Sequence, residues 1–383
     1  MKILHFITSL KFGGAESALY NYLAKVVSDT EDQHVVAYLY DGPNVDKIKN
    51  LGIPVFKISG RCICYSPLIF LRLKRLITKI KPDVLHSSLW SANIISRIVA
   101  NLTGVPLVCD LHGSSVDEGR FRNFLDRLTA SFAAKNVAVS ESVRASYSKC
   151  IVNSIKINYV KNRVAQNLIV IKNGINFEQL REKAFYCKLQ RADLGLVDND
   201  FVVGTVGRLE PIKSYDVLIR AFYAFYKKNE ENSSNLKLVI IGNGSQFITL
   251  QQLSQDLGLS NNVIFTGFRG DAYRFYQLFD CFAISSKSEG LSISLLEALS
   301  FGLPVISTHY DKQHDVVKDK LNGFLVKPMD VSEYAQAINA LYSDPTLRSQ
   351  ISACNLKLVA EQFSIQKVVN DYRKIYLEFS VKP

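Results

Sequence analysis

The stretch CFAISSKSEGLSISLLEALSFGLPVIST, residues 281–308, decides the fold. It opens with an apolar run that predicts a strand over Cys281–Ser285. A helical segment follows and ends at Gly302, and Pro304–Ser307 predicts a second strand. Strands that are apolar along their whole length are typical of a parallel sheet covered on both faces. The stretch therefore predicts one strand–helix–strand repeat of a doubly wound α/β domain.

The same alternation occurs in two sets along the chain. In the first half, the expected strands are Ile3–Thr8, Val35–Tyr40, Val55–Ile58, Asp83–Ser87, Leu107–His112 and Asn136–Ser140. Helical patterns lie at Ser17–Val27, Leu68–Ile80, Ala92–Leu102 and Phe121–Phe132. After a polar, Lys/Arg-rich stretch near Phe177–Asp200, further strands are expected at Phe201–Val206, Leu238–Ile241 and Val263–Thr266. The last helical patterns are Ser332–Tyr342, Leu347–Phe363 and Ile365–Leu377.

These two sets predict an α/β protein with two Rossmann-like, doubly wound domains, because one continuous sheet would show no interruption. We expect an N-terminal domain over residues 1–175 and a C-terminal domain over residues 196–364. In such folds ligands bind at the carboxyl ends of the strands. Functional motifs should therefore lie in the loops that directly follow strands.

Composition bounds the class of protein. The chain has 383 residues and seven scattered cysteines, a pattern typical of the reduced cytoplasm, and no apolar run of membrane-spanning length. Residues 1–173 carry 23 Lys and Arg against 12 Asp and Glu, whereas the remaining residues carry 23 of each. The net charge of +11 therefore comes from the first half. Such a surface suits nucleic acid, anionic lipid or a phosphorylated substrate, or is merely basic.

Two carboxylates flank the start of the helix in the opening stretch. Glu289 precedes Gly290 in the loop, and Glu297 lies within the expected helix. A carboxylate at the top of a sheet can accept hydrogen bonds from vicinal hydroxyls, and free N–H groups at a helix start suit a phosphate. These features predict a nucleotide-sugar site. The alternative is structural, because Ser294 and Glu297 also fit a capping box.

Two motifs follow strands of the first half. Gly13-Gly14 comes after the first strand and opens a helix, so the backbone there can approach an anion closely. His112 ends the strand that starts at Leu107, where it can contact a hydroxyl or a phosphate. Each has a structural alternative, namely a plain strand–helix turn and a histidine that caps a strand. His86 is a weaker candidate, and His5 is expected in the core.

Arg208 and Lys213 bracket the turn after the strand Phe201–Val206. An arginine fork and a lysine point charge can neutralise a departing diphosphate without a metal. A lysine at a helix start is disfavoured by the helix dipole, which favours an anion there over a purely structural role. Phe268 and Arg269 follow the strand Val263–Thr266, where a base could be recognised. No cluster of residues has the spacing of a metal site, so we expect no metal and no cofactor.

The motifs GGAE, DLHG, NGIN at 173–176, VGRLEPIKSYDVLIRAF at 206–222 and SEGLSISLLEALSFGLPVIST at 288–308 together resemble the retaining GT-B glycosyltransferases of family 4. The similarity spans nearly the whole chain. It implies two Rossmann-like domains that face a central cleft, with acceptor binding by the N-terminal domain and nucleotide-sugar binding by the C-terminal domain. It also implies that a helix over about 365–383 packs back on the N-terminal domain.

The resemblance also implies roles for particular residues. Arg208 and Lys213 would hold the donor diphosphate, Glu289 the donor sugar and Glu297 the ribose, with His112 beside the transferred sugar. The catalytic residues would be His112, Arg208, Lys213 and Glu289. The donor-binding residues would be Gly13, Gly14, Arg208, Lys213, Phe268, Arg269, Glu289, Gly290, Leu291, Ser292 and Glu297. The segment His309–Val317 departs from the family, where many members carry a Gly-Gly turn, and this leaves the donor sugar open.

The expected function is a metal-independent, retaining transfer of a hexosyl or N-acetylhexosaminyl group. The expected donor is a UDP-sugar, with a GDP-sugar as the alternative, and the acceptor is a glycan or a polyprenyl-diphosphate-linked saccharide in surface polysaccharide or lipopolysaccharide assembly. A nucleotide-sugar epimerase or hydrolase and a non-catalytic sugar-binding protein remain alternatives. No motif supports nucleic-acid binding.

The location of the enzyme follows from the same observations. We expect a cytoplasmic protein. Leu68–Lys81 forms a basic amphipathic pattern that, with Arg61, Arg120, Arg122 and Arg127, is a candidate for contact with the inner face of the cytoplasmic membrane. The alternative is an ordinary helix packed on the surface of the first domain.

Overall fold

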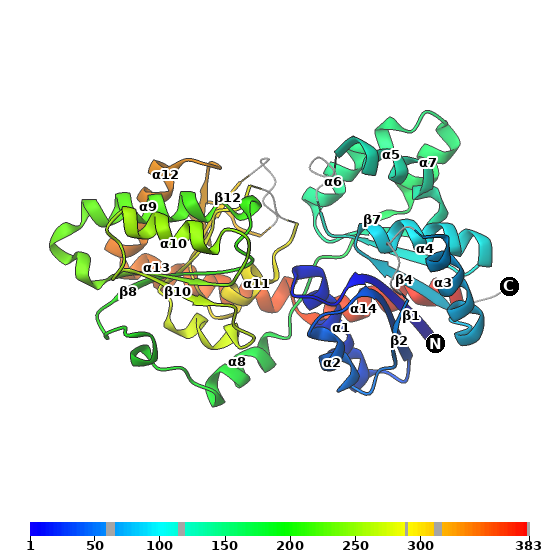
Figure 1. Ribbon diagram of the computed structural model, residues 1–383, viewed down its shortest axis with the longest axis horizontal. Coiled ribbons are helices and arrows are strands. Elements are labelled where there is room, and N and C mark those ends of the chain that lie inside the picture. The colour runs from blue at the N-terminus through cyan, green and yellow to red at the C-terminus, as the bar shows by residue number, and fades with distance from the viewer. Residues whose placement is uncertain (59–65, 114–118, 288–289, 310–315, 381–383) are drawn as a thin grey trace. The chain divides into compact units, whose positions relative to one another are not determined.

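The computed structural model describes residues 1–58, 66–113, 119–287, 290–309 and 316–380. The chain forms two compact units (Figure 1). Unit 1 consists of Met1–Ile175 together with Ile365–Pro383, and unit 2 consists of Asn176–Ser364. The polar stretch that was expected between the domains falls within unit 2.

Unit 1 is built on a seven-stranded parallel sheet with the order β3-β2-β1-β4-β5-β6-β7. Its strands are β1 (Lys2–Ser9), β2 (Gln33–Tyr40), β3 (Val55–Lys57), β4 (Val84–Ser88), β5 (Leu107–Leu111), β6 (Lys135–Ala138) and β7 (Leu168–Val170). Because all strands are parallel, their carboxyl ends lie at one edge of the sheet. The loops that carry Gly13, Gly14 and His112 leave from that edge.

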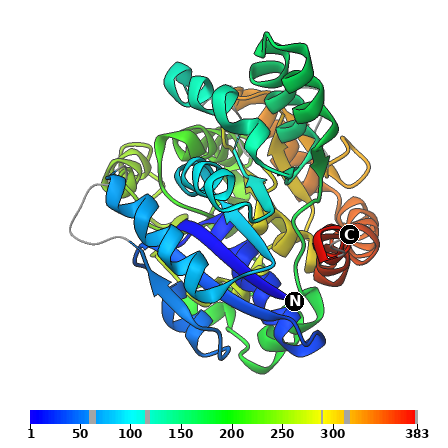
Figure 2. The ribbon, with the colours of Figure 1, turned by 90° about the vertical axis from the view of Figure 1, so that its right-hand side faces the viewer.

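Helices cover both faces of the unit 1 sheet (Figure 2). They are α1 (Gly14–Asp29), α2 (Asn44–Lys49), α3 (Pro67–Ile80), α4 (Trp90–Thr103), α5 (Gly119–Thr129), α6 (Glu141–Cys150), α7 (Asn158–Gln166) and α14 (Ile365–Ser380). One core packs α1, α2 and α14 against alternate residues of β1, such as Ile3 and Ile7. The other packs α3 and α4 against the intervening residues Leu4 and Phe6. The apolar run in β1 therefore faces two cores, as strands buried on both sides require.

Helix α14 returns the chain to unit 1 after unit 2 is complete. Ile365 N donates to Ile175 O at 3.0 Å, so the helix starts beside the end of the first segment. Val368, Val369 and Tyr376 of α14 are buried in the same core as α1. Burial of large apolar side chains of this kind stabilises a docked helix by about 1.5–3 kcal/mol each.

Unit 2 contains a six-stranded parallel sheet with the order β10-β9-β8-β11-β12-β13. Its strands are β8 (Phe201–Val206), β9 (Leu236–Ile241), β10 (Val263–Gly267), β11 (Cys281–Ile284), β12 (Val305–Thr308) and β13 (Gly323–Val326). Its helices are α8 (Phe177–Tyr186), α9 (Tyr215–Lys228), α10 (Phe247–Asp256), α11 (Ile293–Ser300), α12 (Val331–Ser343) and α13 (Pro345–Gln362).

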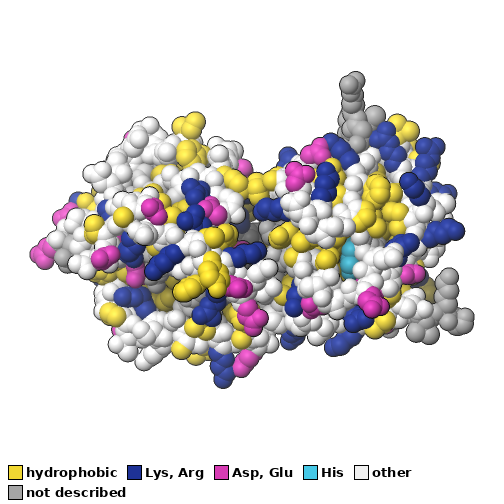
Figure 3. All heavy atoms as spheres, turned by 90° about the horizontal axis from the view of Figure 1, so that it is seen from below, with side chains coloured by type: hydrophobic (Ala, Val, Ile, Leu, Met, Phe, Trp, Pro, Cys, Tyr) yellow, Lys and Arg dark blue, Asp and Glu magenta, His cyan; other side chains and the backbone are white. Residues whose placement is uncertain are grey.

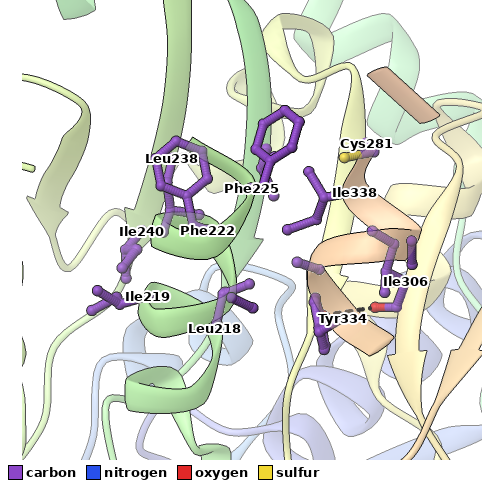
Figure 4. Packing of buried hydrophobic residues seen from close by; sticks show 14 of the residues in the cluster. Leu218, Ile219, Phe222, Phe225, Leu238, Ile240, Cys281, Ile306, Tyr334 and Ile338 are labelled. Carbon is purple, nitrogen blue, oxygen red and sulfur yellow. Dashed lines mark hydrogen bonds between the residues drawn. The ribbon is translucent and has the colours of Figure 1, made fainter. Parts of the chain in front are cut away.

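The core of unit 2 is almost entirely apolar. Phe222 and Phe225 of α9, Leu238 and Ile240 of β9, and Ile338 of α12 are all fully or nearly fully buried (Figure 4). The buried hydroxyl of Tyr334 donates to Ile306 O at 3.1 Å, which satisfies the polar group inside this core.

The expected fold class is confirmed, since both units are doubly wound parallel α/β structures. The strands expected from the sequence appear with boundary shifts of a few residues. Two strands were missed, β7 and β13. Both are short, and β13 begins at a glycine.

Candidate functional site

The Gly13-Gly14 turn starts helix α1 directly after β1. Gly13 is the N-cap, and a Cβ atom at this position would lie 2.3 Å from Oε2 of Glu16. Glu16 is buried, and Ser9 Oγ donates to its Oε1 at 2.5 Å. At Gly14 a Cβ would meet no atom within 4 Å, so the space beside it is open. A side chain at Gly13 would therefore require the Glu16 carboxylate to move, whereas Gly14 leaves the backbone accessible.

His112 follows β5 and lies beside a buried carboxylate. Its Nε2 atom is 4.0 Å from Oδ2 of Asp110, which is the second-last residue of β5. Burial lowers the pKa of His112 below its ordinary value, although the Asp110 charge acts in the opposite direction. The imidazole is therefore neutral near pH 7 and can accept or donate a hydrogen bond.

Asp110 connects several elements of unit 1. Its Oδ1 accepts from Tyr372 OH at 2.8 Å, and its Oδ2 accepts from Ser88 Oγ at 3.1 Å and lies 2.8 Å from His86 Nε2. Burial alone would raise the pKa of Asp110, but His86 and these hydrogen bonds hold it below the ordinary value. Asp110 is therefore an anion next to His112, and contacts from several elements hold its carboxylate in place.

The C-terminal helix supplies two of the side chains around this carboxylate. Tyr372 reaches Asp110, and Tyr376 OH lies 2.6 Å from His86 Nδ1. Sequence patterns did not indicate these contacts, because Tyr372 and Asp110 are 262 residues apart. One signal was present, since Asp110 is an acid within an otherwise apolar strand. His86, a weaker candidate in the sequence, belongs to this network. His5, which was expected in the core, is indeed buried.

In unit 2, Arg208 and Lys213 lie in one loop after β8. Arg208 is exposed, and its neighbour Leu209 donates its backbone N–H to Asn243 O at 3.0 Å. Gly242 and Gly244 permit this contact, because Cβ atoms there would lie 1.8 Å from Gly207 O and 2.5 Å from Leu209 O. The glycines after β9 therefore allow the Arg208 loop to pack closely against them.

The segment that carries Lys213 is fixed through its backbone. Pro211–Lys213 forms one turn of 3-10 helix, and Ser285 Oγ donates to Lys213 O at 2.8 Å. Lys287 N donates to Ile212 O at 2.7 Å, which ties the turn to the loop after β11. The following residue, Ser214, has a φ of 48° and starts α9. The lysine thus stands at the carboxyl ends of β8 and β11.

Phe268 and Arg269 follow β10, as expected, but their side chains differ in how far other residues already contact them. The Phe268 side chain is 45% exposed. Arg269 makes a two-pronged ion pair with Asp271, with both N–O distances at 2.9 Å, and stacks over the Phe275 ring at 5.2 Å. This arrangement occupies much of the guanidinium, so Phe268 is the stronger candidate for contact with a base.

Helix α11 begins one residue after Ser292, its N-cap, and Leu291 before it is buried. The capping box of Ser294 and Glu297, which was the structural alternative to a donor site, does not form. Ser294 lies inside the helix, and Glu297 accepts a hydrogen bond from Tyr276 OH at 2.7 Å. Burial raises the pKa of Glu297 to about 7 despite this hydrogen bond. Gly290 is described, whereas Glu289 lies outside the described residues.

Among the described residues no group of three or more His, Cys, Asp or Glu side chains is placed to hold a metal ion. In the same part of the chain, no helix combines the length and the apolar character needed to cross a bilayer.

Two helices of unit 1 bear on the membrane prediction. In α3, the residues Ile69, Leu73 and Ile77 are buried, so its apolar face packs on the domain and its basic face is exposed. In α5, Phe121 and Leu128 are exposed by 71% and 56%. On the face of unit 1 in Figure 3, Lys and Arg side chains are spread among hydrophobic ones.

Two family models match the chain in adjoining segments. Glycosyltransferase Family 4 matches residues 12–179, and Glycosyl transferases group 1 matches residues 188–355. The two family models and the two doubly wound sheets therefore define a glycosyltransferase of the GT-B class. The chain belongs to the family 4, group 1 glycosyltransferases.

Curated relatives and solved structures agree with this class. The chain is 28% identical to the Escherichia coli UDP-Gal:alpha-D-GlcNAc-diphosphoundecaprenol alpha-1,3-galactosyltransferase, over 81% of this chain and 79% of the relative. It is 26% identical to the capsular polysaccharide biosynthesis glycosyltransferase CapM of Staphylococcus aureus, over 99% and 97%. The crystal structure of Anabaena HepE with UDP-glucose matches with a TM-score of 0.83 and 22% identity, covering 99% of this chain and 100% of that one.

Proposed function

We propose that the protein is a retaining glycosyltransferase that moves a sugar from a UDP-sugar to a hydroxyl of a saccharide linked to a lipid diphosphate. The observation that carries the proposal is the loop after β8, which holds Arg208 and Lys213 at the carboxyl ends of the strands by backbone contacts on both sides. The similarity to an enzyme that acts on UDP-Gal and a diphosphoundecaprenol acceptor supports the choice of substrates. The similarity to a capsular polysaccharide biosynthesis glycosyltransferase supports a product in surface polysaccharide assembly.

Unit 2 binds the donor in this proposal. Arg208 and Lys213 stabilise the negative charge that develops on the departing UDP, which is an electrostatic contribution of about 3–4 kcal/mol for one well-placed group. Glu297 accepts hydrogen bonds from the ribose hydroxyls, and Phe268 contacts the base. Glu289 contacts the donor sugar, and backbone N–H groups at Leu291 and Ser292 assist with the phosphates.

Transfer proceeds with retention at the anomeric carbon. The acceptor hydroxyl forms its C–O bond on the face from which the phosphate oxygen departs, and the hydroxyl proton passes to that phosphate oxygen. Gly14 leaves room for the donor near the start of α1. His112, neutral and adjacent to Asp110, donates a hydrogen bond to the sugar that is transferred. We assign no side-chain nucleophile.

The proposal is tested by incubating the protein with UDP-, GDP- and ADP-sugars and following nucleotide release with and without acceptor. Release of UDP that increases with a saccharide acceptor supports it. Conversion of the donor sugar to its epimer without acceptor would identify the competing epimerase. Binding without any turnover would identify the non-catalytic alternative. Transfer should persist in excess EDTA, because the cations at the diphosphate are Arg208 and Lys213.

A lipid-linked acceptor requires access to a membrane, and we propose that α5 contributes to it. Phe121, Phe124 and Leu128 are three and four residues apart and exposed on one helical face, with Arg120 beside them. This combination suits an interface rich in anionic lipid. Co-sedimentation with phosphatidylglycerol vesicles at low salt should fall in a Phe121→Ser/Phe124→Ser variant. Equal sedimentation of both proteins would refute the contact.

A further inference from the structure

A cavity of about 350 Å³ opens in unit 1 beside His112, at the carboxyl ends of β1, β4 and β5. Trp90 at the start of α4, Arg122 and Asp126 of α5, and Tyr147 of α6 line it with His112. Its volume is in the range of small-molecule sites, large enough for a sugar ring with a substituent. No motif in the sequence pointed to Trp90 or Asp126.

A buried polar network forms one wall of this cavity. The fully buried Arg97 forms an ion pair with Oδ1 of Asp126 and donates to Asn136 Oδ1 at 3.0 Å and Tyr147 OH at 3.2 Å. Trp90 Nε1 donates to the other oxygen, Oδ2 of Asp126, at 2.9 Å. Buried ion pairs seldom add net stability, and one of their uses is to fix geometry. Here the network fixes α5 and the indole ring relative to each other.

Arg122 lies one helical turn before Asp126 on the same face of α5. Its guanidinium carbon is over the Trp90 ring, 4.9 Å from the ring centroid. A guanidinium that stacks by its face keeps its N–H donors in its plane, and their fork matches phosphate oxygens. Arg97 already neutralises Asp126, and among the described residues no acid forms an ion pair with Arg122, so in this proposal its charge serves a ligand.

A second atom of the cavity also lacks a partner. His112 Nε2 is buried and has no hydrogen-bond partner among the described residues. The transferred sugar satisfies His112 in the proposed function, so an acceptor with its saccharide beside that sugar and an anion at Arg122 would fill the rest of the cavity. The two requirements together describe a saccharide that carries a phosphate group.

We propose that this cavity is the acceptor subsite and that Arg122, held on Trp90, binds the diphosphate of the acceptor. The inference rests on the proposed function and deepens it, because it makes the diphosphate a recognition element of the acceptor. A neutral glycan would leave Arg122 without a role in binding.

Trp90 is the only tryptophan of the chain, so its fluorescence reports directly on this cavity. Three probes are compared: N-acetylglucosaminyl diphosphate with an undecyl chain, undecyl N-acetylglucosaminide without phosphate, and UDP. The two undecyl probes are used below their critical micelle concentrations. We expect the diphosphate probe to change the Trp90 emission at the lowest concentration. Arg122→Gln should weaken its binding about tenfold or more, as loss of a charge-assisted contact does. Arg122→Lys should lose less, because it keeps the charge.

The matched control is Arg144→Gln, which removes an exposed arginine of α6 that does not line the cavity and should leave probe binding unchanged. Equal binding of the diphosphate probe by the wild type and Arg122→Gln would overturn the assignment, as would equal affinity for the phosphate-free probe. A response to UDP that depends on Arg122 would assign the anion to the donor instead. A response to none of the probes would also overturn the assignment.

The donor assay on the same protein separates the two proposals. If nucleotide-sugars are consumed while Trp90 does not respond, the subsite is wrong and the proposed function stands. If no nucleotide-sugar is consumed, the proposed function fails whatever Trp90 reports. Thermal unfolding of Arg122→Gln should match the wild type, since the side chain is exposed, and this excludes misfolding as the cause of lost binding.

Discussion

The two units share one topology but differ in what surrounds the carboxyl ends of their strands. In both sheets the first strand lies third from one edge, and the fourth strand pairs with its other side. In unit 1 this region contains buried charge and titratable rings, with Asp110 beside His86 and His112 and with the Arg97–Asp126 pair. In unit 2 the core is apolar, and Glu297, a partly buried acid among the described residues of the site, has a raised pKa.

This difference shows how one fold carries two tasks. The parallel sheet fixes where loops emerge, and the side chains at those loops decide the chemistry. In unit 1, internal hydrogen bonds hold a few polar side chains in place at the carboxyl ends of the strands. Unit 2 instead uses backbone contacts and glycines to bring the Arg208 and Lys213 loop close to the strands.

The largest expected effect comes from breaking the buried charge of unit 1. Asp126→Ala leaves the fully buried guanidinium of Arg97 without its counter-charge and should lower the free energy of unfolding by about 3–5 kcal/mol. Urea denaturation measures it. The matched change in unit 2 is Tyr276→Phe, which removes the hydroxyl that donates to Glu297 and, at 3.4 Å, to Ser294 O, and should cost about 1 kcal/mol. Equal losses for the two variants would contradict the contrast between the units.

The second prediction concerns the rate of sugar transfer and a substitution in unit 2. Lys213→Ala should lower the transfer rate at saturating donor about 100-fold or more, because it removes a cation from the departing diphosphate. The free energy of unfolding of the Lys213→Ala variant should differ from that of the wild type by less than about 0.5 kcal/mol. Lys227→Ala, a change at an exposed lysine of the neighbouring α9, is the control and should leave the rate unchanged. An unchanged rate for Lys213→Ala would remove the lysine from the mechanism.

A smaller effect should appear in the pH dependence of unit 2. The pKa of Glu297 is raised from 4.5 to about 7 by folding, so the folded protein binds this proton more tightly than the unfolded chain does. Stability should therefore fall as pH rises between about 4.5 and 7, by about 1–3 kcal/mol. UDP affinity should increase over pH 6–8, because the ribose requires the carboxylate. Both trends should be absent in Glu297→Gln, and thermal shift with and without UDP measures them.

The smallest effect tests the link between α14 and the His112 site. Tyr372→Phe removes the hydroxyl that donates to Asp110 and should cost about 1 kcal/mol of stability. It should also reduce the transfer rate more than it changes the donor KM, because it frees the carboxylate beside His112. Tyr38→Phe is the matched control, since it removes a tyrosine hydrogen bond to Asp41 in the same unit. If the transfer rate and the donor KM change equally in both variants, the role of α14 is purely structural.

Residues with a strong local signal were predicted correctly in position. Strand β8 and the loop with Arg208 and Lys213 were placed from a continuous apolar run followed by a turn. The apolar run and following helix of the opening stretch likewise form β11 and α11. These features depend on neighbours in the sequence, so local periodicity is sufficient to find them.

Other contacts depend on partners that the local sequence pattern did not indicate. The capping box at Ser294 and Glu297 was a valid local pattern, but Tyr276 reaches the carboxylate and the helix starts earlier. Arg269 stays a predicted donor-binding residue, and the structure adds that Asp271 and Phe275 contact its guanidinium. In each case a side chain had two partners open to it, and packing selected one.

The sequence by itself determined the two doubly wound units, the family and the loop that carries Arg208 and Lys213, because each depends on local periodicity or on short motifs. Only the tertiary structure decided that Asp110 joins His112 to tyrosines of the last helix, and that Arg122 lies over Trp90 beside a cavity. The physical reason is that buried polar groups must find partners, and those partners come from wherever the fold brings chain segments together.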